Sequence, residues 1–341
     1  MPGPVGRRRP VTVLGCLALA AVLTGTGGTA RAAGPPQARE ATTRDTTTAK
    51  ARDRRSAQVR AYWTPARMAA AVPGEQLVRA ASPDRVTRRP GLSAYLTRLA
   101  AARAAAPATD RGSTWRHGGL AARTTGKVFF SLGGGDYVCS GSAVSSPDRS
   151  TVLTAGHCVH DPDVGAYATR WVFVPGYARD ARPYGMFPAA HLAAPAGWRT
   201  GRDYDVDLAF VDVDPNEAGR LLTDVVGGQP VAFATPRGRA VQALGYPAQD
   251  PWDGELLIGC SGPVRQDPRA RASTDQGLAC TMTGGSSGGP WLSDFDPVTG
   301  RGTLTSVTSF GYTDEPGVLW GPYLGSVAKA LYTSVASTRS R

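Results

Sequence analysis

Histidine is scarce in this sequence, and its placement limits the chemistry that the chain can perform. Only four histidines occur, at positions 117, 157, 160 and 191, and none follows Ser287. Residues 285–289 (GSSGG) fit the G-x-S-x-G pattern of the nucleophile elbow in α/β-hydrolases. That fold orders its catalytic residues as serine, acid and then histidine. The order found here therefore excludes an esterase of that fold.

A long apolar run is missing as well. The N-terminal apolar stretch, residues 11–23, is too short to span a bilayer. It follows the basic residues 7–9, and residues 30–32 (ARA) fit the small-x-small cleavage pattern. We therefore expect a signal peptide at residues 1–32, a secreted, extracellular protein and no stable membrane insertion. Cys16 lies in the apolar core of this peptide and is expected to be removed with it.

Residues 33–113 differ from the rest in having no cysteine and a strong positive charge. They contain 15 basic and 6 acidic residues, a net charge of +9, and the signal peptide adds +4. The chain total of +11 therefore leaves −2 for residues 114–341. A basic chain often binds nucleic acid, but here the positive charge belongs to the leader. We therefore expect no nucleic-acid partner.

From residue 126 onward, short runs typical of strands are separated by Gly, Pro, Asp and Ser, and nothing indicates repeated βαβ units. Such spacing favours a sandwich or barrel. Residues 323, 327, 331 and 335 are apolar and recur every four positions, which predicts a C-terminal helix. The expected strands are 127–130, 137–144, 151–153, 170–174, 208–213, 231–234, 240–244, 256–259, 277–281, 290–292 and 303–310.

Two segments carry the chemistry. Residues 283–290 (TGGSSGGP) place serine among four glycines, so the loop can turn sharply and expose its N–H groups. A serine nucleophile needs an accessible hydroxyl and N–H donors that face the developing oxyanion. Residues 154–158 (TAGHC) follow the apolar pair 152–153 and supply a histidine, whose unperturbed pKa near neutrality suits a general base.

Together these segments resemble the chymotrypsin-like serine endopeptidases, which carry T-A-G/A-H-C around their histidine and G-x-S-G-G-P around their serine. Both occur here in the family's order, with His157 and Ser287 separated by 130 residues. The resemblance covers residue 126 to the C-terminus and is nearest to the secreted bacterial group that includes the glutamyl endopeptidases. It implies an all-β fold of two antiparallel β-barrels with a C-terminal helix. Residues 114–225 would carry the histidine and acid, and residues 226–341 the serine.

Within this resemblance, each catalytic role has a candidate. Ser287 is the expected nucleophile, rather than Ser286, because it stands directly before Gly-Gly-Pro. His157 is the expected base. Asp207 is expected to orient the imidazole, because the following Leu-Ala-Phe fits the family motif, which Asp205 does not. The backbone N–H groups of Gly285 and Ser287 are the expected oxyanion hole.

Four cysteines remain outside the signal peptide, and they allow three pairings. The resemblance favours Cys139–Cys158, which leaves Cys260–Cys280. Each bond would close a loop of about 20 residues and stabilise the fold by roughly 3 kcal/mol, and disulfides suit a secreted protein. A disulfide explains Cys158 better than the weak metal pattern formed by His157 and His160. We therefore expect no metal and no cofactor.

The expected substrate pocket is walled by the segment before the serine and by a later strand, namely Thr281, Met282, Thr308, Ser309, Phe310 and Gly311. Thr281 stands six positions before Ser287, where an acidic residue would indicate a preference for Arg or Lys. Thr308 stands where the glutamyl branch often has histidine, which counts against glutamate. The sequence leaves open a preference for small or uncharged substrate side chains. Of the other histidines, His117 is expected near the processing region, and His160 and His191 in surface loops.

The leader has two possible uses. The resemblance implies a pro-segment removed on activation, with cleavage expected between about Arg111 and Thr125, and an amphipathic helix over residues 92–106 would suit docking. It could instead be an arm that contacts anionic cell wall. Ser286 replaces the Asp that in many relatives pairs with the new N-terminal amine, so activation differs here or the leader only blocks the cleft.

The sequence therefore predicts a secreted, monomeric serine endopeptidase that hydrolyses protein or peptide substrates through an acyl-enzyme intermediate. The alternative is a non-catalytic, protease-like binding or adhesion domain. A serine-directed phosphonate would distinguish them, because a binding domain would not be labelled at Ser287.

Overall fold

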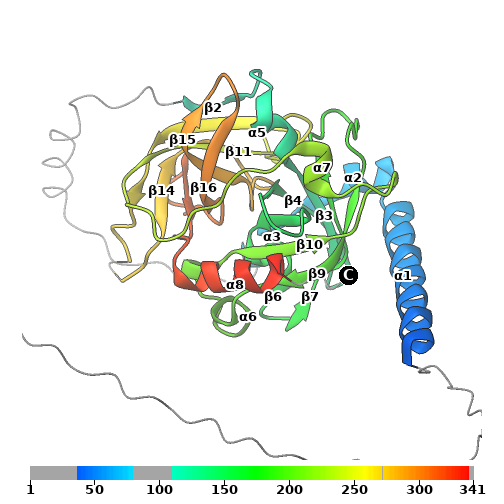
Figure 1. The fold of residues 1–341 in the computed structure, drawn as a ribbon. Helices are drawn as coiled ribbons and strands as arrows, with labels where there is room; N and C mark the ends of the chain where they lie inside the picture. Colours follow the sequence, from blue (N-terminus) through cyan, green and yellow to red (C-terminus); the bar gives the residue numbers. More distant parts are fainter. Residues whose placement is uncertain (1–36, 80–109, 271, 338–341) are drawn as a thin grey trace, which may run out of the picture. The chain divides into compact units, whose positions relative to one another are not determined.

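The computed structural model describes residues 37–79, 110–270 and 272–337 (Figure 1). The expected signal peptide and the expected helix over 92–106 lie outside these residues. The chain divides into two units, residues 1–47 and 48–341, and the following description concerns the second. Among the described residues, no helix combines the length and apolarity needed to cross a membrane.

The first half of this unit contains a closed barrel. A seven-stranded sheet has the order β1-β4-β3-β8-β9-β10-β5, and β5 also pairs with β4, which closes the ring. Apolar β-branched and aromatic residues such as Val128, Phe130 and Phe173 pack together in one buried cluster, and β3 is buried along its whole length. The strands are β1 (Val72–Pro73), β3 (Thr125–Leu132), β4 (Gly135–Ala143), β5 (Thr151–Thr154), β8 (Thr169–Pro175), β9 (Phe187–Ala193) and β10 (Ala209–Val213).

The second half is built from two sheets, a five-stranded one in the order β16-β15-β11-β12-β2 and a three-stranded one in the order β13-β14-β17. The Cys260–Cys280 disulfide joins β12 to the segment after β14. Strand β2 pairs with β12 and begins at Asp110, before the expected domain boundary at 114. The strands are β2 (Asp110–Thr114), β11 (Ala240–Gly245), β12 (Ile258–Pro263), β13 (Arg265–Gln266), β14 (Gln276–Ala279), β15 (Pro290–Asp296), β16 (Arg301–Val307) and β17 (Val318–Gly321).

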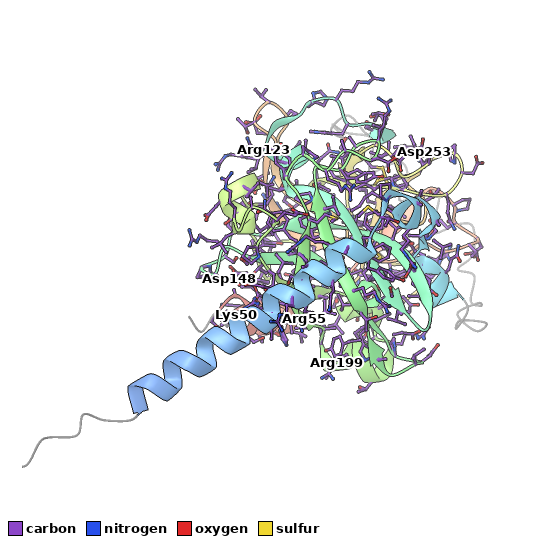
Figure 2. The ribbon with its side chains drawn as sticks, turned by 90° about the vertical axis from the view of Figure 1, so that its right-hand side faces the viewer. Lys50, Arg55, Arg123, Asp148, Arg199 and Asp253 are labelled. Carbon is purple, nitrogen blue, oxygen red and sulfur yellow. A yellow bond between two sulfur atoms is a disulfide. The ribbon has the colours of Figure 1, made fainter. Side chains whose placement is uncertain are left out.

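Helices are short apart from α1, which carries basic side chains such as Arg55 (Figure 2). The helix α8 packs against β10 through buried Ala328 and Val335, so the all-β prediction with a terminal helix is confirmed. The remaining elements are α1 (Gln37–Tyr62), α2 (Pro65–Ala70), α3 (Glu75–Arg79), α5 (Gly119–Thr124), η1 (Gly156–Cys158), β6 (His160–Asp161), β7 (Ala166–Tyr167), α6 (Ala196–Gly201), η2 (Tyr204–Val206), α7 (Leu222–Val226) and α8 (Ser326–Ala336).

The strand predicted at residues 231–234 is wrong. Only an isolated bridge from Val231 to Leu304 forms there. Pro230 lacks the N–H that a ladder needs, and Ala234 has a φ of 54°, outside the extended region. Apolar composition alone suggested a strand, but the backbone forms no continuous strand at these residues.

The placement of His160 in a surface loop is also wrong. His160 lies in the short strand β6, is only 5% exposed, and packs edge-on against Tyr167 with ring centroids 4.8 Å apart. Its carbonyl oxygen accepts a hydrogen bond from the buried indole of Trp198. His191, in contrast, is exposed, although it lies in β9 rather than in a loop.

Gly126 gives a test of how tightly the barrel strands pack. It lies in β3, where a Cβ atom would come within 2.4 Å of the Val174 carbonyl oxygen and 2.6 Å of the Pro175 Cα. Because backbone cannot move aside cheaply, Gly126→Ala is expected to lower the free energy of unfolding by about 1–3 kcal/mol. Urea denaturation followed by tryptophan fluorescence would measure this change.

Gly201 provides the matched control, since a Cβ there would meet nothing within 4 Å. Gly201→Ala is expected to change the free energy of unfolding by less than about 0.5 kcal/mol. Equal unfolding midpoints for the two variants would contradict the close approach of β3 to β8.

Candidate active site

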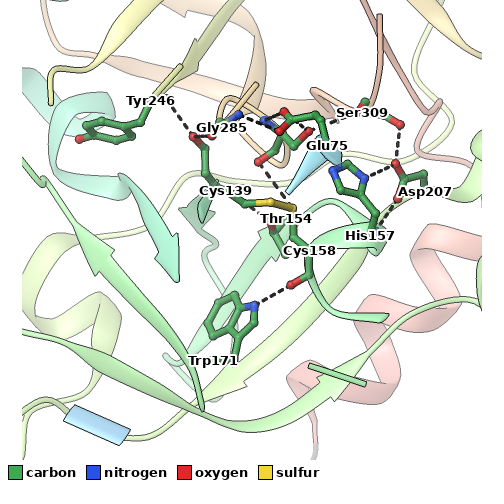
Figure 3. The surroundings of a disulfide bond; sticks show 12 residues. Glu75, Cys139, Thr154, His157, Cys158, Trp171, Asp207, Tyr246, Gly285 and Ser309 are labelled. Carbon is green, nitrogen blue, oxygen red and sulfur yellow. Dashed lines mark hydrogen bonds and ion pairs between the residues drawn. A yellow bond between two sulfur atoms is a disulfide. The ribbon is translucent and has the colours of Figure 1, made fainter. Parts of the chain in front are cut away.

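His157 and Asp207 meet because their strands are paired. Strand β5 ends just before the histidine, and β10 begins just after the aspartate, with Thr154 opposite Ala209 in an antiparallel ladder. The Asp207 carboxylate accepts the backbone N–H of His157 at 2.8 Å through Oδ1, and its Oδ2 lies 2.8 Å from the imidazole Nδ1 (Figure 3). Gly156 permits this approach, because a Cβ there would lie 2.8 Å from Asp207 Oδ1.

The neighbouring aspartates have different partners. Asp203 caps the short helix η2 by accepting the N–H of Asp205 at 3.1 Å. Asp205 accepts hydrogen bonds from the Ser273 hydroxyl at 2.5 Å and from the Thr274 N–H at 2.9 Å. Of the three alternating aspartates, Asp207 is the one hydrogen-bonded to His157 among the described residues, and its pairing supports the sequence-based choice between them.

The serine loop has the conformation for which its glycines are suited. Gly285 and Gly288 have φ angles of 98° and 80°, in the region that favours glycine. A Cβ on Gly288 would also come within 2.4 Å of the Ser140 carbonyl oxygen. The Ser286 hydroxyl turns back to donate to the Thr283 carbonyl at 2.7 Å. The Ser286 hydroxyl is therefore bonded within the loop, whereas the Ser287 hydroxyl bonds to a residue outside it.

That hydroxyl is bound to a residue that sequence reasoning did not single out. Ser287 Oγ donates to Glu75 Oε1 at 2.5 Å and lies 3.3 Å from the Ser309 carbonyl oxygen. The N–H groups of Gly285 and Ser287 also donate to the Glu75 carboxylate, at 2.8 and 3.1 Å. Imidazole Nε2 of His157 has no hydrogen-bond partner among the described residues. Glu75 is one of six acidic residues in the basic leader and stands in no motif, so the sequence gave no signal of this contact.

His157 is 1% exposed, and several charges act on it. Burial lowers the pKa of His157, but the Asp207 carboxylate, through its charge and its hydrogen bond, raises it. Glu75 raises it further, the Arg202 guanidinium lowers it, and the net result is a pKa above the ordinary 6.5. An imidazole in this setting holds a proton more strongly than one in water, which suits a group that must accept one.

A second buried carboxyl lies near this pair. Burial, followed by the negative charges of Asp205, Asp207 and Asp267, raises the pKa of Asp275 to about 8. Its side chain is therefore largely protonated at neutral pH, which spares Asp207 an additional negative neighbour.

All six residues expected to form the pocket line a single cavity of about 550 Å³ beside the serine loop. The later segment 312–319 also contributes, together with Gln249 and Asp250, which sequence reasoning missed because no motif marks them. Ser309 has a further contact, since its hydroxyl donates to Asp207 Oδ2 at 2.5 Å. Among the described lining residues the ionisable ones are all acidic, and Glu315 is paired with Arg265 and Arg269.

Both expected disulfides are present, Cys139–Cys158 and Cys260–Cys280. Cys139, His157 and Cys158 place possible ligand atoms within 4.8 Å of one another, the only such group among the described residues. Because the two sulfur atoms are bonded to each other, they offer no thiolate to a metal ion.

Comparisons with known proteins agree with this geometry. Residues 139–300 match the trypsin-like peptidase domain. Protease Anisep from Arthrobacter nicotinovorans is 40% identical, with a TM-score of 0.62 over 67% of this chain and 100% of that one. The thermostable serine protease AL20 from an extremophilic microorganism is also 40% identical, with a TM-score of 0.60 over 64% of this chain and 100% of that one.

A curated relative adds to these. The glutamyl endopeptidase of Bacillus licheniformis is 29% identical over 147 residues, which span 41% of this chain and 41% of that protein. The match thus covers less than half of that relative's length. The two solved proteases, in contrast, are matched over their whole lengths at 40% identity. The chain therefore belongs to the trypsin-like serine peptidases of the chymotrypsin fold and is a serine-type endopeptidase.

Proposed function

We propose that this endopeptidase is secreted and hydrolyses protein or peptide substrates with Ser287 as nucleophile, His157 as general base and Asp207 as the group that orients the imidazole. The observation that carries the proposal is the pair of 2.8 Å contacts between Asp207 and His157, at the edge of the first barrel that faces the serine loop. Asp207 thereby fixes both the backbone and the ring of His157, which supports a base held in one orientation.

In the acylation step, Ser287 Oγ attacks the substrate carbonyl carbon while its proton passes to Nε2 of His157. The carbonyl oxygen becomes an oxyanion, which the N–H groups of Gly285 and Ser287 would stabilise. His157 then gives its proton to the leaving amine as the peptide bond breaks. In the second step a water molecule attacks the acyl-enzyme, with His157 again accepting and then returning a proton to Ser287.

The pocket supports a preference for uncharged side chains. No Lys, Arg or His occurs among its described lining residues, so an acidic substrate side chain would be buried without a cationic partner. Thr281, Met282 and Thr308 offer methyl, thioether and hydroxyl groups instead. The acidic side chain of Glu315 already has two arginine partners, which makes it a poor partner for a basic substrate side chain.

The two disulfides support an oxidising, extracellular destination for the mature chain. The basic n-region and apolar core at the N-terminus support export through a signal peptide. Both features favour the secreted enzyme over an intracellular one.

Replacement of the nucleophile tests the catalytic assignment. Ser287→Ala is expected to lower kcat by about 10⁴- to 10⁶-fold in the processed enzyme, because the covalent step is lost. Peptide hydrolysis and labelling by a serine-directed phosphonate would measure this, with circular dichroism to check folding. Ser286→Ala is the matched control and should keep activity within about tenfold, since Ser286 bonds only its own loop. Comparable losses in both variants would argue against Ser287.

The pH dependence gives a second test. kcat/KM should rise with pH as His157 loses its proton and becomes able to act as a base. Because the Arg202 charge lowers the pKa of His157, Arg202→Gln should raise that pKa and move the acid limb of the profile to higher pH. Arg199→Gln removes a charge that lowers the pKa of His160 instead, and should leave the limb in place. An unchanged or lower limb in Arg202→Gln would contradict the effect of the Arg202 charge on His157, and a wild-type profile without an acid limb would contradict His157 as the base.

A peptide library with a varied residue before the scissile bond tests the pocket. Uncharged side chains should give kcat/KM values at least about a hundredfold above those for glutamate, since burying an unpaired carboxylate costs several kcal/mol. Preferential cleavage after glutamate would show that a cation outside the described lining enters the pocket, and would overturn this preference.

A further inference from the structure

Part of the leader is packed on the catalytic body through a buried tryptophan. Trp63 follows α1 and is only 1% exposed. Its indole N–H donates to the carbonyl of Arg170 in β8 at 2.6 Å, and its ring centroid lies 5.4 Å from that of Phe129. Met68 in α2 is also buried in this cluster. A side chain the size of tryptophan, buried in the core of the first half, is a strong anchor.

Charges reinforce the anchor. Asp214, which is buried, accepts hydrogen bonds from Ser56 and Arg52 on α1. Asp136 in β4 accepts the Tyr62 hydroxyl at 2.9 Å and pairs with Arg67 at 3.2 Å. The leader carries a net +9 and residues 114–341 a net −2, so the overall charges of the two parts are complementary.

Beyond this anchor the leader crosses to the catalytic loop as a strand. Val72 and Pro73 form β1, which pairs in parallel with Tyr137 and Val138 of β4. The N–H of Gly74 donates to the Val138 carbonyl at 2.9 Å, and a Cβ on Gly74 would lie 2.7 Å from the Cys139 sulfur. Glycine at this position lets the chain approach the disulfide closely, and the next residue is Glu75.

We propose that residues 48–79 are a built-in inhibitor of the intact chain, in which the Glu75 carboxylate occupies the oxyanion hole and captures the Ser287 hydroxyl. Glu75 Oε2 accepts the Gly285 N–H at 2.8 Å, and Oε1 accepts the Ser287 N–H at 3.1 Å and the Ser287 hydroxyl at 2.5 Å (Figure 3). The inference rests on the proposed function and adds its regulation. The Glu75 carboxylate thus bonds the same two N–H groups that are expected to stabilise the oxyanion.

This contact blocks two requirements of catalysis together. The N–H groups that should receive the oxyanion are already bonded to a full negative charge. The proton that Ser287 must pass to His157 is directed to Glu75 instead, and His157 Nε2 is left without a partner among the described residues. A substrate carbonyl, which is neutral, must displace a charge-assisted network before it can react.

Labelling of the full chain tests the inhibitor. A small dialkyl fluorophosphonate is used because it needs only the nucleophile and the oxyanion hole, and only the band with the mass of the intact chain is counted. Glu75→Gln keeps the side-chain shape but removes the charge, and Glu75→Ala removes the group altogether. Both should be labelled at Ser287 about ten- to a hundredfold faster than the wild-type intact chain, as expected when charge-assisted hydrogen bonds are lost. Gln76→Ala alters the exposed neighbour and should match the wild type.

Labelling of the wild-type intact chain at the rate of the Glu75 variants would overturn the inhibitor while leaving the proposed function in place. Wild-type chain cleaved by limited proteolysis, with its N-terminus sequenced, provides the reference for an open site. If neither that form nor the Glu75 variants were labelled at Ser287, the proposed function would fail and the inhibitor with it.

A second measurement does not depend on reactivity. Because Glu75 raises the pKa of His157, NMR titration of the intact chain should give a lower imidazole pKa in Glu75→Gln than in the wild type. An unchanged value would place the carboxylate away from the catalytic centre and sink the proposal. Thermal unfolding of each variant checks that the fold is retained.

Discussion

The catalytic arrangement depends on hydrogen bonds that tie the serine loop to the first barrel. The N–H of Ser140 in β4 donates to the Ser287 carbonyl at 2.7 Å. Its hydroxyl donates to the Gly285 carbonyl at 2.9 Å and accepts the N–H of Tyr246 at 2.9 Å. With histidine and aspartate on one half of the unit and serine on the other, such contacts help to fix the distance between them, together with the core that the two halves share. Ser140 is fully buried, so its bonds do not compete with water.

Local patterns in the sequence predicted what local physics determines. The strand runs, the terminal helix and the glycines of the serine loop depend on side-chain alternation or on backbone freedom, and both can be read from neighbouring residues. The role of Ser140 could not be predicted, because its partner Gly285 lies 145 residues away and no motif surrounds either contact. The contact between Glu75 and Ser287, which are separated by 212 residues, was not predicted for the same reason.

The aspartates show how much a sequence motif can predict about a catalytic acid. The residues after Asp207 distinguished it from Asp205. They did not indicate how several carboxylates can lie near one imidazole. In the structure the Asp205 carboxylate accepts hydrogen bonds from Ser273 and Thr274, and burial together with the Asp205 charge raises the pKa of Asp275 to about 8. These are properties of burial and of contacts between distant loops, which composition cannot supply. Assigning a catalytic acid from sequence therefore says little about the field in which it works.

A site built to stabilise an oxyanion is also a site that binds a carboxylate, because both offer negative oxygen to the same N–H donors. A free carboxylate binds such a pair of donors weakly, since it is equally well solvated by water. Glu75 is not free. Trp63 and the β1–β4 pairing hold it beside the loop, so its effective concentration exceeds that of a dissolved acid by orders of magnitude. Cutting the chain between Glu75 and the catalytic part does not remove these contacts, so the carboxylate leaves the N–H donors only when Trp63 and the β1–β4 pairing also come apart.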